Sequence, residues 1–261
     1  MTINDLKKRQ SLGEKLTMLT CYDYSSATIM NDSDIDIILV GDSAAMVMHG
    51  EQSTLPIDYA TMAQHVRAVV RGAPDKFIIA DMPFLSFRQS IDKGMEAVAA
   101  LMQAGAHAIK LEAVTGHEDF IRQVVQSGIP VMGHLGLTPQ FVNQFGGFKV
   151  QGKNQQAQDK IMAETNALEQ LGCFSVVLEC VPAELAARVT AGTEMITIGI
   201  GAGKDVDGQV LVMHDMLGYP SAFSPQFVRR YLNAEVLFKE AFNRFANEVR
   251  NGDFPNDKES Y

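Results

Sequence analysis

The chain has 261 residues, a formal net charge of −9 at pH 7, a sequence pI near 5.1 and an apolar share of 46%. This length is close to the ~250 residues of one (β/α)8 barrel, with no obvious room for a second domain, and the apolar share suffices for a full core. Lysine and arginine are scattered, which argues against a nucleic-acid or membrane partner and favours a small-molecule substrate.

The first residues and the cysteines indicate a cytoplasmic protein. The opening MTINDLKKRQ has no apolar leader region, and no stretch approaches 18 apolar residues. Cys21, Cys173 and Cys180 form no C-x-x-C pair and lie in or beside apolar runs, as reduced core thiols do. We therefore expect neither export nor a membrane span.

Eight short β-branched or apolar runs recur along the chain, with helical segments between them. Runs of this kind predict buried parallel strands, and in a (β/α)8 barrel the carboxyl ends of the strands meet at one face. We expect one barrel domain over residues 1–261, with additional C-terminal helices. The runs are 16–23, 35–43, 76–84, 107–113, 129–137, 174–182, 195–203 and 208–215.

Five segments between these runs show the apolar spacing of helices. Each has one apolar stripe and closes near a glycine, which suits the left-handed conformation after a helix end. The segments are 56–72, 90–105, 118–128, 158–172 and 183–192.

A polar stretch at residues 138–156 interrupts this alternation. It contains Phe141, Phe145 and Phe148, and it is longer than an ordinary connection, so it is a candidate lid or binding loop. A surface excursion with a short helix after Pro139 explains it equally well.

The end of the chain departs from a regular barrel. Only residues 204–207 separate the last two runs, whereas a parallel crossover needs about a dozen residues. Either the last run is not a regular strand, or the seventh strand stops early. The apolar spacing over 224–252 predicts one or two helices that close the barrel or reach a neighbouring subunit.

Carboxylates follow three of the predicted strands. Asp42, Asp81 and Glu112 together form an oxygen-rich set suited to a hard octahedral cation, whereas zinc lacks its preferred paired histidines or cysteines. A structural alternative is that Asp42 or Ser43 only caps the following helix.

Three further groups lie at strand ends. Lys110 shares a strand face with Glu112 and is placed to bind a substrate carboxylate, or alternatively to form a structural ion pair. Glu179 is a candidate general base if its surroundings are apolar, and otherwise an ion-pair partner. His134 could donate a hydrogen bond to a substrate oxygen, or be a satisfied core histidine.

Several motifs together resemble one enzyme family, ketopantoate hydroxymethyltransferase. They match it in order and spacing from about Leu16 to Leu217. The motifs are LTCYDYSSA, VGDSAAMVMHG, STLP, ADMPF, IKLEA, GHLGLTPQ, VVLECVP and GIGAGKDVDGQVLVMHDMLG.

The resemblance implies a fold and a reaction. The fold would be a TIM barrel of the phosphoenolpyruvate/pyruvate type. The enzyme would transfer a hydroxymethyl group from 5,10-methylenetetrahydrofolate to 3-methyl-2-oxobutanoate in pantothenate biosynthesis. The reaction would pass through an enolate stabilised by one Mg²⁺ per subunit. The protein would be a homo-oligomer, a homodecamer by this resemblance.

The same resemblance implies roles for individual residues. Asp42 and Asp81 would be direct magnesium ligands, and Glu112 would complete the metal surroundings. Glu179 would be the proton acceptor. The residues expected to contact the 2-oxo acid are Asp42, Ser43, Asp81 and Lys110.

Two motifs depart from the family pattern. The chain has DSAAM at 42–46 where relatives typically have DSLGM, and LEAV at 111–114 where they have IEGG. The added Cβ atoms remove the glycine preference for positive φ, so we expect a changed local backbone or pocket, and with it a changed substrate scope.

Two other functions remain open from the sequence. A carbon–carbon lyase or mutase of the wider pyruvate-binding barrel group would share the metal and the enolate but would not need folate. A catalytically silent scaffold is disfavoured, because a buried acidic cluster without a metal destabilises a protein.

Overall fold

The computed structural model describes residues 1–147, 149–220 and 225–261. Phe148 of the candidate lid and Ser224, the first residue of the predicted tail helices, lie outside the described residues. The chain divides into two compact units, Met1–Val212 and Met213–Tyr261. The first unit contains all eight strands that the sequence predicts.

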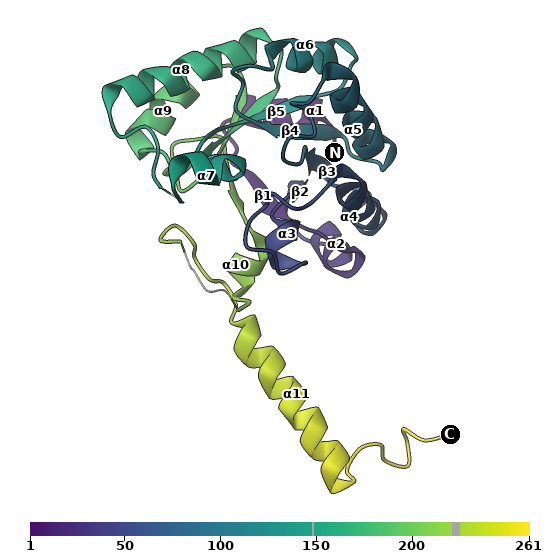
Figure 1. Cartoon of the computed structure of the whole chain (residues 1–261). Helices are drawn as coiled ribbons and strands as arrows, with labels where there is room; N and C mark the ends of the chain where they lie inside the picture. Colours follow the sequence, from purple (N-terminus) through teal and green to yellow (C-terminus); the bar gives the residue numbers. More distant parts are fainter. Residues whose placement is uncertain (148, 221–224) are drawn as a thin grey trace. The chain divides into compact units, whose positions relative to one another are not determined.

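The strands of the first unit form a closed parallel barrel in the order β1 to β8, with β8 pairing back onto β1. Figure 1 shows the strands at the centre of this unit with helices around them. The predicted (β/α)8 class is therefore confirmed. The strands are β1 Leu16–Thr20, β2 Ile37–Val40, β3 Phe77–Asp81, β4 Ala108–Glu112, β5 Val131–Gly136, β6 Ser175–Glu179, β7 Ile196–Ile200 and β8 Gly208–Leu211.

Helices occupy most of the predicted segments, with starts shifted by up to three residues. Asp58, Ser90 and Asn154 each accept a hydrogen bond at a helix N-terminus, which sets where α4, α5 and α8 begin. The helices of this unit are α1 Ile3–Ser11, α2 Tyr24–Asn31, α3 Ala44–Val47, α4 Tyr59–Gly72, α5 Ile91–Gln103, α6 Glu118–Gln126, η1 Pro139–Phe141, α7 Val142–Phe145, α8 Gln155–Gln170 and α9 Ala183–Ala191.

The connection between β7 and β8 resolves the doubt about the last strand. β8 is a regular strand, and β7 ends at Ile200, earlier than the predicted run. Gly208 pairs with Ile198, which lies two residues before the end of β7. At 3.3 Å per residue, the chain therefore returns along the strand direction by only about 7 Å before β8 begins. A helical crossover is therefore unnecessary here.

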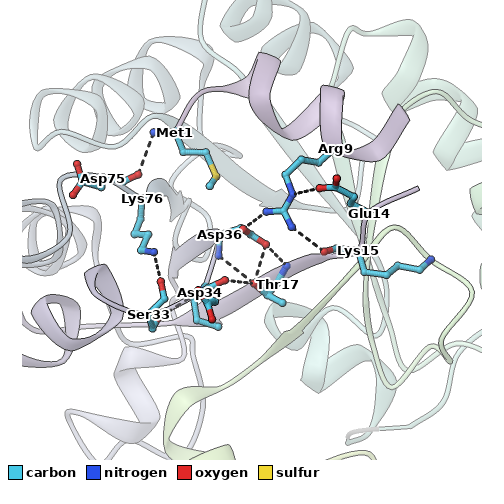
Figure 2. A network of polar contacts seen from close by, with 11 residues as sticks. Met1, Arg9, Glu14, Lys15, Thr17, Ser33, Asp34, Asp36, Asp75 and Lys76 are labelled. Carbon is cyan, nitrogen blue, oxygen red and sulfur yellow. Dashed lines mark hydrogen bonds and ion pairs between the residues drawn. The ribbon is translucent and has the colours of Figure 1, made fainter. Parts of the chain in front are cut away.

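Polar contacts hold the amino-terminal end of the barrel together (Figure 2). The Asp36 carboxylate accepts hydrogen bonds from the Thr17 backbone N–H and hydroxyl, at 2.8 and 2.9 Å, and forms an ion pair with Arg9. Asp207 does the same before β8, accepting from the Thr197 N–H and hydroxyl at 2.8 and 2.9 Å. These contacts stabilise the amino-terminal end of the barrel. The opposite end, where the strands end, is left for a functional site.

The second unit consists of α10 (Met213–Leu217) and α11 (Ala234–Asn251) with the segments beside them. On α11, Leu237, Phe242 and Phe245 are 48%, 70% and 55% exposed. The described residues contain no helix that is long and apolar enough to cross a membrane.

Candidate active site

The predicted site residues meet at the carboxyl ends of neighbouring strands. Asp81, Glu112 and Glu179 are the last residues of β3, β4 and β6. Asp81 pairs in register with Lys110, and Glu112 with His134 of β5. The barrel therefore brings together groups that are far apart in the sequence.

Asp42, Asp81 and Lys110 form the buried centre of the site. The Asp42 backbone N–H donates to Asp81 Oδ2 at 3.0 Å, and Lys110 Nζ lies 2.8 Å from Asp81 Oδ1. All three residues are at most 5% exposed. The structural ion pair that was the alternative for Lys110 is therefore present. It lies at the same end of the barrel as the expected substrate contact.

Excess negative charge raises the pKa of one carboxylate. Burial raises the Asp42 pKa well above its usual value, as do the neighbouring Asp81 and Glu112 charges, while Lys110 and the Gln140 amide act in the opposite direction. The Lys110 pKa is raised despite burial, because these same carboxylates favour its charged form. Three carboxylates share this one ammonium.

His134 connects two of the carboxylates. Its Nδ1 lies 3.5 Å from Glu112 Oε1 and 3.3 Å from Lys110 Nζ, and its Nε2 lies 3.1 Å from Glu179 Oε2. Burial and Lys110 lower its pKa, but Glu112 and Glu179 outweigh them and raise it to about 9. The Glu179 carboxylate therefore has an imidazole beside it, so the ion-pair alternative for this residue is present and its surroundings are not purely apolar.

The Ser43 hydroxyl contacts the side chain of Tyr22, which lies just after β1. Tyr22 Oη donates to Thr20 Oγ1 at 2.7 Å and lies 2.8 Å from Ser43 Oγ. Ser43 precedes α3 but makes no side-chain cap hydrogen bond, and Asp42 faces the other carboxylates. The capping alternative for this pair is therefore wrong.

Gln140 belongs to the site, and sequence reasoning missed it. Its side-chain amide donates to Asp42 Oδ2 and to the Met82 carbonyl oxygen, both at 2.9 Å, and its backbone N–H donates to Glu112 Oε2 at 2.9 Å. It lies in the 138–156 stretch, which has the short helix predicted after Pro139. One residue of the candidate lid thus contacts three strand ends, and the length of this stretch was the only signal.

The donor set fits a hard divalent cation. Asp42 and Asp81 offer oxygen ligands beside a third carboxylate, Glu112, in a buried cluster with surplus negative charge. Within the described ranges, no group of three or more Asp, Glu, His or Cys side chains is arranged to enclose a metal ion. Mg²⁺ does not require one, because it commonly takes one or two carboxylates plus water and substrate oxygens.

The chain adopts positive φ at several non-glycine residues, and two of them directly follow Glu112 and Glu179. Ala113 has φ +63°, Cys180 has φ +49° and Leu85 has φ +59°. Ala113 therefore adopts the left-handed conformation that glycine favours, at a steric cost. At 44–45 both alanines lie in α3, where no positive φ is needed.

The glycine-rich loop between β7 and β8 is closely packed. A Cβ on Gly203 would lie 2.5 Å from the Ala183 Cβ, and one on Gly208 would lie 2.6 Å from the Leu16 carbonyl oxygen. Close packing alone accounts for these glycines.

Two other predicted runs, 16–23 and 208–215, end in the carboxylates Asp23 and Asp215. Asp23 caps α2 by accepting a hydrogen bond from the Ser26 N–H at 2.9 Å. Asp215 lies in α10 of the second unit.

Comparison with known proteins agrees with this arrangement. A sequence model of ketopantoate hydroxymethyltransferase matches residues 1–257. The chain belongs to this family. Two relatives, both named 3-methyl-2-oxobutanoate hydroxymethyltransferase, come from Bdellovibrio bacteriovorus and Coxiella burnetii. The first is 55% identical over 100% of this chain and 99% of its own length, and the second 52% identical over 98% and 96%.

Solved structures place this family member's fold among related barrels. A 2,3-dimethylmalate lyase of the PEP mutase/isocitrate lyase superfamily has a TM-score of 0.63 at 16% identity, covering 99% of this chain and 91% of the other. A phosphonopyruvate hydrolase complexed with oxalate and Mg²⁺ has a TM-score of 0.63 at 13% identity, covering 99% and 93%. The likeness shows that this chain shares the barrel fold of these proteins.

Proposed function

We propose that this protein is a 3-methyl-2-oxobutanoate hydroxymethyltransferase. It transfers the one-carbon unit of 5,10-methylenetetrahydrofolate to 3-methyl-2-oxobutanoate, with water supplying the hydroxyl oxygen, and releases ketopantoate and tetrahydrofolate, a step of pantothenate biosynthesis. The observation that carries the proposal is the meeting of Asp42, Asp81, Lys110 and Glu179 at one barrel face, in a chain that belongs to the family over nearly its whole length.

The metal would be held by Asp42 and Asp81, with Glu112 completing its surroundings and one ion per subunit. When bound, Mg²⁺ would act as a Lewis acid toward the 2-oxo acid and would stabilise the negative charge that develops on its 2-oxo oxygen. The phosphonopyruvate hydrolase relative, whose solved complex contains oxalate and Mg²⁺, supports this assignment by analogy of fold.

Lys110 and Ser43 bind the substrate in this proposal. The Lys110 ammonium offers a buried positive charge to the 2-oxo acid, while Asp81 fixes its position at 2.8 Å. Tyr22 Oη lies 2.8 Å from Ser43 Oγ and holds this hydroxyl in position, so that it is oriented to form a further hydrogen bond with the substrate.

Glu179 acts as the general base. Its carboxylate takes the C3 proton of the 2-oxo acid, which leaves C3 nucleophilic toward the one-carbon unit. His134 Nε2 lies 3.1 Å away and orients this carboxylate. Gln140 covers the strand ends from the 138–156 segment and restricts the access of water to them.

One assay tests the proposal directly. Purified protein is incubated with Mg²⁺ and 3-methyl-2-oxobutanoate, with and without 5,10-methylenetetrahydrofolate, and ketopantoate is measured. We expect product only with folate present, complete loss on chelation, and recovery when Mg²⁺ is restored. Turnover in metal-free buffer contradicts the metal assignment, and a folate-independent lyase reaction contradicts the transferase assignment.

We also propose that the protein works in the cytoplasm as a homo-oligomer, a homodecamer by family resemblance. The exposed apolar residues of α11 support contact with another copy of this chain, because apolar side chains in water favour burial.

A further inference from the structure

Two histidines face each other outside the carboxylate cluster. His49 Nε2 lies 2.9 Å from His65 Nε2, and the two rings meet at an interplanar angle of 76°. His49 is exposed after α3, and His65 is half-buried on α4. Neither residue takes part in the proposed reaction.

The backbone determines the tautomer of His65. Its Nδ1 lies 2.7 Å from the Tyr22 carbonyl oxygen, which can only accept, so Nδ1 must carry a proton and donate it. In the neutral ring Nε2 then has a free lone pair, and that lone pair is directed toward His49. Metal-binding histidines are commonly oriented in this way, with the second ring nitrogen donating to a backbone carbonyl.

The nitrogen spacing is close to that of a chelate. Two imidazole nitrogens bound to Zn²⁺ at roughly 2.0–2.1 Å with a tetrahedral angle lie about 3.3 Å apart. The observed 2.9 Å therefore needs an opening of only about 0.4 Å, and His49 is exposed and free to tilt. We propose that His49 and His65 form a two-nitrogen binding site for a divalent transition-metal ion such as Zn²⁺ or Cu²⁺.

The surroundings provide room for the remaining ligands. His49 lines a hollow of about 150 Å³ together with Glu51 and Thr61. Because about 10–15 Å³ of such space holds one water molecule, this hollow accommodates several. Among the described residues no third protein ligand completes the site, so water fills the other positions.

The ligand chemistry separates this site from the carboxylate cluster. Imidazole nitrogens favour Zn²⁺, Cu²⁺ and Ni²⁺, whereas carboxylates favour Mg²⁺. A bound ion would link His49, which follows α3, to His65 on α4. It would thereby cross-link the two sides of the 48–58 loop. The inference does not depend on the proposed enzymatic activity.

The test measures binding of Zn²⁺ and Cu²⁺ to tag-free protein in excess Mg²⁺. Two variants remove one nitrogen each while keeping the local hydrogen bond. The His49→Gln side-chain amide can still donate to His65, and the His65→Asn amide can still donate to the Tyr22 carbonyl. We expect the wild type to bind one ion per chain, and each variant to lose at least tenfold in affinity. The Cu²⁺ electron paramagnetic resonance spectrum should show coupling to two nitrogens.

A second readout is thermal stability. Zn²⁺ should raise the melting temperature of the wild type and leave that of both variants unchanged, because only an ion that binds the folded state stabilises it. Glu51→Gln is the matched control, since it alters the same hollow but keeps both nitrogens, and it should bind as the wild type does. Equal Zn²⁺ affinity in the wild type and the histidine variants, or a larger loss in Glu51→Gln than in either of them, overturns the proposal and leaves the histidine pair a hydrogen bond only.

Discussion

The carboxylates of Asp81 and Glu179 have different partners, and we expect different losses when each is neutralised. Asp81 pairs with Lys110, whereas Glu179 lies beside His134. Asp81→Asn should weaken metal and substrate binding. Glu179→Gln should leave the 2-oxo acid bound but lower exchange of its C3 proton with deuterated water by at least about 10²-fold, as for loss of a general base.

This exchange is measured by nuclear magnetic resonance with Mg²⁺ and without folate, so it separates proton removal from one-carbon transfer. Substrate binding is measured in parallel by calorimetry. Undiminished exchange in Glu179→Gln would mean that another residue is the base.

Ala113 offers a test of backbone strain beside the site. A left-handed alanine costs roughly 1–2 kcal/mol, whereas glycine adopts φ +63° without that cost but loses about 0.4–1 kcal/mol through its freer unfolded state. We therefore expect Ala113→Gly to stabilise the protein by about 0.5–1 kcal/mol in urea unfolding. A destabilised variant would show that the alanine methyl contributes packing that exceeds the strain.

At the scale of elements, the short β7–β8 connection depends on one carboxylate. Asp207 Oδ2 accepts from the Thr197 N–H and hydroxyl and from Gln10 Nε2 at 3.1 Å. Asp207→Ala removes all three bonds and should destabilise the fold by about 1.5–3 kcal/mol in urea unfolding. Asp205→Ala changes an exposed carboxylate of the same loop and should stay within about 0.5 kcal/mol of the wild type. Equal effects in the two variants would show that the hydrogen bonds of Asp207 contribute nothing specific.

Local patterns predicted the eight strands, the main helices and the strand-end groups, because apolar spacing and glycine positions are properties of neighbouring residues. Contacts between distant segments were not predictable in this way. The amide of Gln140 reaches Asp42 from another element, and the level at which Gly208 meets Ile198 depends on the stagger of the whole barrel. The imidazole beside Glu179 was missed for the same reason.

For the whole molecule, one buried histidine predicts a loss of stability in acid. His117 is 6% exposed, and burial followed by the positive charge of Arg88 lowers its pKa from 6.5 to about 4. The unfolded chain then binds more protons between these two values, so this stabilisation is complete above pH 6.5 and is lost as the pH falls toward 4. At 1.36 kcal/mol per pKa unit, the loss is at most about 3.4 kcal/mol.

The comparison variant is His117→Phe, which retains an aromatic ring against Phe87, 4.9 Å away between centroids, and cannot titrate. Urea unfolding at several values between pH 4 and pH 7 should give a smaller dependence for the variant than for the wild type. Identical slopes would show that His117 is protonated in the folded protein.

The exposed apolar side chains of α11 predict that the protein is an oligomer. Light scattering at micromolar concentration should give a mass well above the 28.6 kDa of one chain. Truncation at Tyr219 should lower both the oligomer size and the stability if this helix covers an interface, and should cause misfolding if it only closes the barrel. A monomeric wild-type protein refutes the oligomer and leaves the enzyme assignment untouched.

The pairing of β1 with β8 also bears on how the chain folds during synthesis. Leu16 pairs with Gly208, so the first strand to leave the ribosome keeps an unpaired edge until nearly the whole barrel has been made. Contacts between such distant residues make folding slow. The β8 strand pairs with β1 over four positions but with β7 over only two, so β8 docks mainly on the oldest strand. The growing chain is therefore most exposed to aggregation just before residues 208–211 emerge.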